Sequence, residues 1–185
     1  MVMEKTSGEA TGIWVGRVDR IEPEALAGAD FSFEVTEEAR PPFDGPGLPS
    51  IKPIIGFRKE YGIDYDLLSG ADADNLMIAA AQLNARVVAY VAVSRSWNNC
   101  ALVEELAVDR AYRRAGVARQ LMNAVVEWAR EVNLPAIRLE TQSTNVAACR
   151  FYERYGFEMG GTIDIFIPHC LRRTEMKPHC FGIYE

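Results

Sequence analysis

Histidine is scarce in this chain: its 185 residues contain 2 histidines beside 4 cysteines. No pair of cysteines has C-x-x-C spacing, although His169 and His179 each lie next to a cysteine. None of these spacings is that of a zinc finger. We therefore expect no metal site, and we expect reduced, partly buried thiols at Cys100, Cys149, Cys170 and Cys180.

Long apolar segments are also missing. No apolar run approaches the roughly 20 residues that a membrane-spanning helix needs. The first residues, "MVMEKTSGEATG", lack the charged and then apolar layout of a secretory signal. We expect a cytoplasmic protein that does not associate with membranes.

The composition is ordinary for a globular protein, with 49% hydrophobic and 25% charged residues and a formal net charge of -6. This length predicts a single domain over residues 1–185. Charge is uneven, because residues 1–109 hold 18 acids and 9 bases whereas residues 110–185 hold 8 acids and 11 bases. This asymmetry is compatible with a cationic ligand on one side and an anionic ligand on the other, or with solvated surface charge alone. The basic excess is too small and local to favour nucleic acid as a partner.

The first part of the chain gives few structural signals. Residues 12–21 alternate weakly and predict a strand. Residues 39–53 contain five prolines and two glycines, which predicts a long loop, and loops of this length are often lids or binding loops. Residues 57–74 are polar with interspersed aromatics and predict no element.

The pattern is clearer from Asn75 onward. Two apolar runs, residues 75–83 and 86–94, are joined by Asn84-Ala85 and predict a hairpin. The remaining expected elements are a turn at 96–99, a strand at 100–109, a helix at 116–132, a strand at 136–141, a helix at 145–156, and closing strands at 157–167 and 179–185. The apolar face of the first helix would contain Val117, Leu121, Ala124, Val125, Trp128 and Val132. This order predicts a mixed α/β sheet in one domain.

The segment "RRAGVARQLM" (113–122) places arginines at the start of the first of these helices. The free N–H groups and the positive dipole end of a helix N-terminus attract phosphates. Gly116 would let the main chain approach closely, Ala118 is too small to obstruct, and Arg113, Arg114 and Arg119 would bond to phosphate oxygens. The segment has neither the Gly-Lys-Ser/Thr of a Walker loop nor a dinucleotide G-x-G-x-x-G. It predicts a polyphosphate site, although a solvated basic helix start fits the same residues.

"RRAGVA" fits the Q/R-x-x-G-x-G/A signature of the GNAT acetyltransferases, and "LETQSTNVAACRFYERYGF" (139–157) resembles the strand, asparagine and tyrosine helix of that family. The resemblance covers about residues 75–167. It implies the GNAT fold, with a central, mostly antiparallel sheet whose strands splay between flanking helices, acetyl-CoA as cosubstrate, and a homodimer by analogy. "SWNN", "VEELAV" and the segment from 138 to 166 are similar to the streptothricin (nourseothricin) acetyltransferases within it, which acetylate an amine on the β-lysine part of the antibiotic.

The resemblance also assigns roles by position. The main chain of Leu106, Ala107 and Val108 would pair with pantetheine, and a backbone N–H there would polarise the thioester carbonyl. Tyr152 would bind the coenzyme and protonate its departing sulfur, and Asn145 would bond the coenzyme arm or serve only as a helix cap. The loop Arg113, Arg114, Ala115, Gly116, Val117 and Ala118, with Arg119, would hold the pyrophosphate.

The general base is left open among three carboxylates. Glu104 and Glu105 are adjacent, so we expect them on opposite faces of their strand. Glu140 lies on the neighbouring strand, where some relatives place the base. Glu104 and Glu140 could instead hold a cationic substrate, with Trp97 and Asn98 shaping its pocket.

The acceptor is therefore expected to be a small cationic amine, in the first instance a streptothricin. An aminoglycoside, a polyamine or a protein N-terminus fits the acidic N-terminal half equally well. A binding module without catalytic activity is the alternative outside the enzymes, but binding alone requires neither Tyr152 nor the strand carboxylates.

Overall fold

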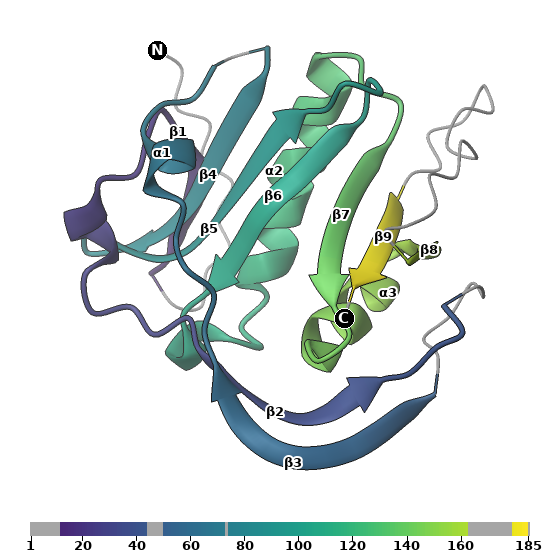
Figure 1. Cartoon of the computed structure of the whole chain (residues 1–185). Helices are drawn as coiled ribbons and strands as arrows, with labels where there is room; N and C mark the ends of the chain where they lie inside the picture. The colour runs from purple at the N-terminus through teal and green to yellow at the C-terminus, as the bar shows by residue number, and fades with distance from the viewer. Residues whose placement is uncertain (1–11, 44–49, 73, 163–178, 185) are drawn as a thin grey trace.

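The computed structural model describes residues 12–43, 50–72, 74–162 and 179–184. Its main sheet has the strand order β1-β4-β5-β6-β7-β9-β8 (Figure 1). The strands β1, β4, β5 and β6 pair antiparallel, whereas β6 with β7, β7 with β9, and β9 with β8 pair parallel. The strands are β1 (Trp14–Val18), β4 (Leu76–Leu83), β5 (Arg86–Arg95), β6 (Ala101–Val108), β7 (Ile137–Gln142), β8 (Glu158–Thr162) and β9 (His179–Tyr184).

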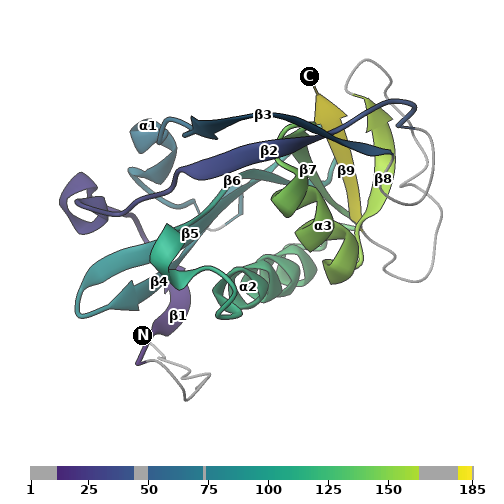
Figure 2. The same ribbon diagram turned by 90° about the horizontal axis from the view of Figure 1, so that it is seen from below.

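Helices cover the two faces of this sheet, and a separate ribbon crosses one end of it (Figure 1 and Figure 2). The helix α2 (Val117–Glu131) and the helix α3 (Val146–Tyr155) pack against one core. The opposite face carries the short helices η1 (Pro23–Leu26) and α1 (Tyr65–Leu68). A two-stranded antiparallel ribbon of β2 (Phe33–Ala39) and β3 (Ile51–Lys59) runs across the ends of β6 and β7, and the turn η2 (Arg110–Tyr112) leads from β6 toward α2. The predicted mixed α/β fold is confirmed.

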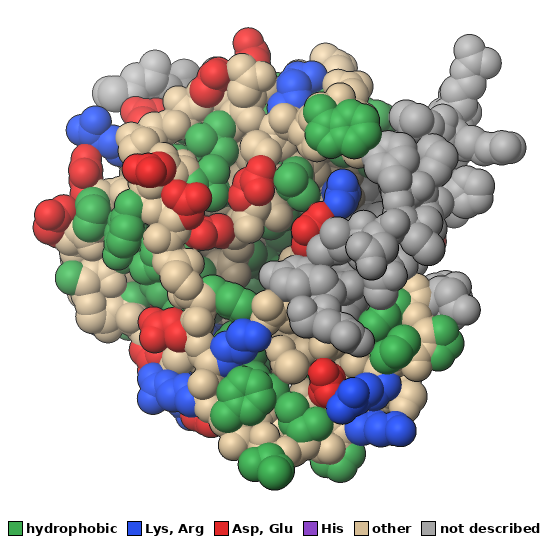
Figure 3. All heavy atoms as spheres, viewed as in Figure 1, with side chains coloured by type: hydrophobic (Ala, Val, Ile, Leu, Met, Phe, Trp, Pro, Cys, Tyr) green, Lys and Arg blue, Asp and Glu red, His purple; other side chains and the backbone are tan. Residues whose placement is uncertain are grey.

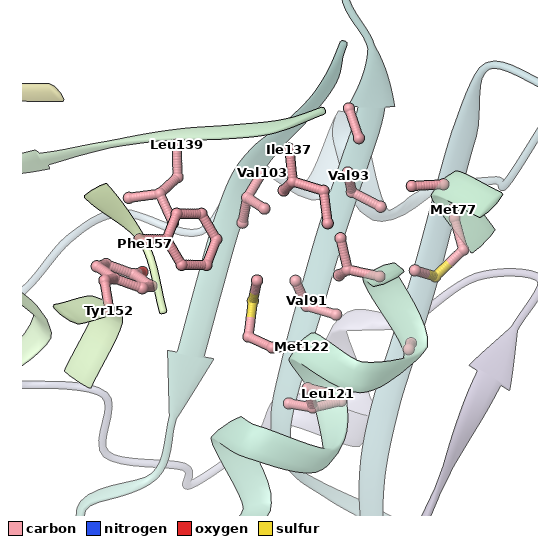
Figure 4. Packing of buried hydrophobic residues seen from close by; sticks show 14 of the residues in the cluster. Met77, Val91, Val93, Val103, Leu121, Met122, Ile137, Leu139, Tyr152 and Phe157 are labelled. Atoms are coloured by element: carbon pink, nitrogen blue, oxygen red, sulfur yellow. The ribbon is translucent and has the colours of Figure 1, made fainter. Parts of the chain in front are cut away.

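The larger core lies between the sheet and α2. Leu121 and Met122 are fully buried and face Val91 and Val103 of the sheet (Figure 4). The predicted helical face is confirmed, since its six residues are buried or packed against this core. Burial of such side chains stabilises the fold by about 1.5–3 kcal/mol each, and the helix is thereby fixed behind β5 and β6.

Two turns between strands of the main sheet occur where the sequence predicts them. Asn84 and Ala85 have φ values of 50° and 66°, as a two-residue hairpin with the right-handed strand twist requires. Asn99, with φ of 60°, closes the turn before β6. Asn145 caps α3 and Gly156 ends it in the left-handed conformation, so the predicted boundaries of that helix are confirmed.

The strands β6 and β7 pair over three positions only, from Ala101 with Ile137 to Val103 with Leu139. Directly after this, the register of β6 against β5 shifts, because Val103 pairs with Val93 and Glu105 pairs with Ala92. Glu104 is therefore the extra residue of a β-bulge, which bends and twists a strand. Beyond the bulge β6 stays on β5 and leaves β7, and Figure 1 shows the two strands parting. The predicted splay is present at this point.

The predictions for the N-terminal part were partly wrong. The expected loop 39–53 overlaps the end of β2 and the start of β3, and Pro53 is itself paired with Glu37. Proline is tolerated there because each strand of a two-stranded ribbon has one free edge. Residues 57–74, which predicted no element, contain the end of β3 and helix α1. The strand predicted at 157–167 is observed to Thr162, and its remainder lies outside the described residues.

In the part of the chain that the structure describes, no helix is long and apolar enough to cross a membrane.

Candidate functional site

The N-terminus of α2 is open to a ligand. Gly116 is its N-cap, with φ of 80°, and no side chain caps the helix there. The first helical bond runs from Gln120 N to Gly116 O, so the N–H groups of Val117, Ala118 and Arg119 have no acceptor within the helix. A Cβ added at Gly116 would meet nothing within 4 Å, which leaves room beside these donors. The geometry is that of an anion site at a helix start.

The three arginines near this loop differ in their burial and in their contacts. Arg113 is half-buried and donates to Val108 O at 3.0 Å and to Phe31 O at 2.9 Å. Burial lowers the pKa of Arg113 from its usual value. Its guanidinium thus fastens the loop to β6, while the exposed Arg114 and Ala115 lie at the loop surface. The exposed Arg119 lies over the ring of Tyr155 at 5.5 Å.

A buried carboxylate also holds the loop that precedes α2 in place. Asp109 is 4% exposed, caps η2 by accepting from Ala111 N at 2.9 Å, and accepts from Arg86 at 3.1 Å. Buried charges are retained when they are paired and hydrogen-bonded in this way. The start of α2 is therefore held rigidly against the end of β6.

The open edge of β6 continues this site. Leu106, Ala107 and Val108 pair with β5 on one side, and the register with β7 ended at Val103. The side chains of Leu106 and Val108 join the α2 core, while Ala107 joins the core on the opposite face. Apart from Val108 O, which accepts from Arg113, the main-chain groups of this segment on the β7 side are thus available to pair with an extended ligand, as an unpaired strand edge is.

Tyr152 lies in α3, beside Phe157 and close to Leu139 of β7 (Figure 4). It is 7% exposed, and its ring packs on Phe157 at 5.6 Å and on Phe151 at 5.3 Å. Burial raises the pKa of Tyr152 above that of an ordinary phenol, with smaller contributions from Cys149 and Tyr61. The phenol is therefore a neutral O–H donor at physiological pH.

Asn145 serves as the α3 cap. Its side-chain oxygen accepts from Ala148 N at 3.3 Å, and its carbonyl accepts from Cys149 N at 3.1 Å. Capping uses the oxygen of the amide, whereas a coenzyme arm could bond to its NH₂ group. The two roles that the sequence left open are therefore compatible.

The prediction that Glu104 and Glu105 face opposite sides of β6 is wrong. Ser94 donates its hydroxyl to Glu104, and Tyr90 donates to Glu105 Oε2 at 2.8 Å. Ser94 and Tyr90 are four residues apart on β5, hence on one face. The bulge at Glu104 breaks the alternation in β6, so both carboxylates lie on the face that carries α1.

Glu140 lies on this face too, but it is paired. It follows Leu139, whose side chain is in the α2 core, and Arg138 donates to its carboxylate. Figure 3 shows acidic side chains gathered on this face, around α1 and over the neighbouring strands. Such a surface attracts cationic ligands.

Trp97 and Asn98 lie elsewhere. Their turn precedes β6, so it is at the end of that strand farthest from the α2 loop, and the Trp97 side chain is 80% exposed. The structure does not bring them to the phosphate loop, and their role in an acceptor pocket stays a prediction.

Residues 59–64, which we name the strap, lie in the stretch for which the sequence predicts no element. On one side Lys59 and Tyr61 both donate to Gln142 at the end of β7, the latter at 3.1 Å. On the other side Asp64 N donates to Glu105 on β6 at 3.1 Å. The strap thus joins the two parted strands. No local pattern signals this, because both anchors are distant in the sequence.

No cluster of three or more metal-ligating side chains occurs among the described residues. Cys100 and Cys149 are buried, as expected, and neither is in a disulfide within the described residues. Cys170 and His169 lie outside the described residues, and the side chains of His179 and Cys180 are not described either.

Residues 35–157 match the model of the family described as the acetyltransferase (GNAT) family. The streptothricin acetyltransferase of Escherichia coli is 35% identical over 117 residues, which are 63% of this chain and 64% of that protein. The streptothricin acetyltransferase of Streptomyces lavendulae is 30% identical over 146 residues, or 75% and 77% of the two chains. The match to the E. coli protein thus spans slightly less than two thirds of its length.

Two solved structures share the fold. One is a protein assigned as a streptothricin acetyltransferase from Bacillus anthracis str. Ames, in complex with acetyl coenzyme A. It has a TM-score of 0.67 and 28% identity, covering 79% of this chain and 84% of that chain. The other is a nourseothricin acetyltransferase with a TM-score of 0.62 and 26% identity, covering 79% and 83%.

Replacing Gly116 by alanine is predicted to weaken acetyl-CoA binding about tenfold or more, because the new methyl group would occupy the space beside the helix N–H groups. The positive φ adds about 1–2 kcal/mol of backbone strain. Calorimetric titration measures the affinity, and urea unfolding measures the stability.

The matched control is Gly28→Ala, since Gly28 has a similar φ of 74° and lies outside the loop. We expect it to lose comparable stability but to bind acetyl-CoA normally. Equal affinities for the two variants would contradict the assignment of the Gly116 loop.

Proposed function

This chain belongs to the acetyltransferase (GNAT) family, and from this premise we propose that it is an acetyl-CoA-dependent N-acetyltransferase. We further propose that its acceptor is an amine of a streptothricin-class antibiotic, on the β-lysine part, and that acetylation confers resistance. The single observation that carries the activity is the open edge of β6, which leads directly to the uncapped start of α2.

These two features fit the two parts of acetyl-CoA. The unsatisfied N–H groups at residues 117–119 and the space at Gly116 suit a diphosphate. The main chain of Leu106, Ala107 and Val108 suits an extended amide-containing arm on the side that faces the gap, apart from Val108 O, which accepts from Arg113, since such an arm can pair like a strand. Acetyl-CoA supplies an activated acetyl thioester.

The residues of this chain would then divide the chemistry. A main-chain N–H of β6 beyond the bulge would polarise the thioester carbonyl. A carboxylate on the α1 face would bind the acceptor ammonium and take up its proton, directly or through water that carries it to solvent, so that the neutral nitrogen can attack the thioester carbonyl. Tyr152, neutral and buried, would donate its proton to sulfur as the C–S bond breaks, and the phenolate would be reprotonated from solvent.

The choice of acceptor rests on the relatives and on charge. Two relatives at 30% identity or more are streptothricin acetyltransferases, as are the two solved structures by their names. The acidic face beside β6 is compatible with a polycation. Aminoglycosides, polyamines and protein N-termini are the other amines to compare. A cytoplasmic location, a homodimer and a single domain over residues 1–185 stay predictions.

Thiol release from acetyl-CoA measures the proposed activity directly. We expect purified protein to release thiol with streptothricin, and expect kcat/KM for it to exceed that for aminoglycosides and polyamines. A sensitive bacterium that expresses the chain should grow on nourseothricin. Unchanged sensitivity, together with a better acceptor among the other amines, would reject streptothricin. Binding of acetyl-CoA without thiol release with any amine would favour the non-catalytic binding module.

Tyr152→Phe is predicted to lower kcat by about 100-fold, because it removes the proton donor for sulfur. The affinity for acetyl-CoA should change little, since the ring and its packing remain. Tyr155→Phe is the control, because Tyr155 lies one turn after Tyr152 in α3 and its hydroxyl donates to Asn123 of α2 at 2.9 Å. Loss of this hydroxyl should leave kcat nearly unchanged. If Tyr152→Phe instead weakened acetyl-CoA binding at unchanged kcat, the acid role would be wrong.

A further inference from the structure

Glu105 is the carboxylate on the acidic face whose orientation is fixed from two sides. The hydroxyl of Tyr90, on the neighbouring strand β5, donates to Glu105 Oε2 at 2.8 Å. Asp64 N of the strap donates to its Oε1 at 3.1 Å. Each carboxylate oxygen has two lone pairs, so each retains one acceptor site after these bonds. The group is thus held in one rotamer while it can still bind a cation.

The other two carboxylates are placed less favourably for this task. Glu140 is committed to Arg138, and the guanidinium offsets its charge. Glu104 is the bulge residue, is exposed, and is bonded by the hydroxyl of Ser94. Glu105 alone among the three is half-buried and beyond the bulge, where β6 has lost its β7 partner. It therefore lies nearest the open strand edge on the acceptor side.

Tyr90 is built to hold this carboxylate. It is 2% exposed, and its ring packs edge-on against Phe31 at 5.6 Å, so the hydroxyl cannot swing away. Burial and the neighbouring Glu105 raise the pKa of Tyr90 above its usual value, so the phenol remains a donor. A buried donor with a single fixed direction selects one orientation of its acceptor.

We propose that Tyr90 is a positioning residue that, together with the Asp64 amide of the strap, directs the Glu105 carboxylate toward the ammonium group of the acceptor amine. The inference rests on the proposed acetyltransferase function and deepens it, because it specifies which glutamate binds the acceptor. Glu105 contacts the substrate, and Tyr90 acts through Glu105. The strap provides the second fixed contact to Glu105. Asp64, which donates its N–H to Glu105, is itself held at the N-cap of α1, where its side chain accepts from Leu67 N at 3.0 Å.

Steady-state kinetics of Tyr90→Phe test the proposal with the amine that gives the highest turnover in wild type. Because only the orientation of the acceptor site is lost, we expect KM for the amine to rise about tenfold while kcat changes less than about threefold. KM for acetyl-CoA should be unchanged. A merely structural role for the hydroxyl would affect both substrates or neither.

Ser94→Ala is the matched control. It removes a hydroxyl from the same face of β5 and from the neighbouring carboxylate Glu104. We expect its KM for the amine to stay within about twofold of wild type. If Ser94→Ala raised this KM and Tyr90→Phe did not, Glu104 would be the acceptor residue and the proposal would be wrong.

A double-mutant cycle with Glu105→Gln completes the test. Since Tyr90 acts only through Glu105, Tyr90→Phe should add less than about twofold to the KM of the Glu105→Gln variant. Independent, multiplicative effects would overturn the proposal, as would a Tyr90→Phe protein that no longer binds acetyl-CoA. A wild-type protein without turnover on any amine would instead reject the proposed function, and the two failures are thus distinguishable.

Discussion

The divergence of β6 from β7 after three paired positions is the constraint on which the site depends. An unpaired strand edge inside a sheet costs main-chain hydrogen bonds, so it persists only where surrounding structure enforces it. Here the bulge at Glu104 turns β6, while the α2 core holds Val103 and Leu106 on the other face. The strap then joins Glu105 in the middle of β6 to Gln142 at the end of β7, across the gap. The free edge is thus stabilised as a feature of the fold, ready to pair with a ligand.

The same bulge organises the charges. Because it interrupts the alternation of side chains, it places Glu104 and Glu105 together on the α1 face, away from α2. The uncapped start of α2 lies at the other end of the strand segment, where helix donors attract an anion. An anionic coenzyme and a cationic acceptor can therefore approach the parted strands from different directions without competing for the same side chains. The excess of acids before residue 110 and of bases after it is compatible with this separation of the two ligands.

Local signals in the sequence predicted much of this and missed the rest for identifiable reasons. Some features depend only on residues that are close together in the sequence, and the structure contains them as predicted. They are the hairpin at Asn84-Ala85, the amphipathic face from Val117 to Trp128 and the caps of α3. The ribbon of β2 and β3 was missed, because Pro53 and polar neighbours conceal a strand that lies at an edge. The bulge and the strap depend on partners distant in the chain. For this reason the face of Glu105 and its bond to Asp64 could not be predicted, although Glu105 itself was among the candidates.

Backbone amide chemical shifts during titration with acetyl-CoA test the central claim most directly, since the account assigns the ligand to main-chain groups. We predict that the largest changes fall on the amides of residues 106–108 and 116–119, with smaller changes on the strap. Saturable binding that shifts other amides, and leaves both of these segments unchanged, would contradict the account.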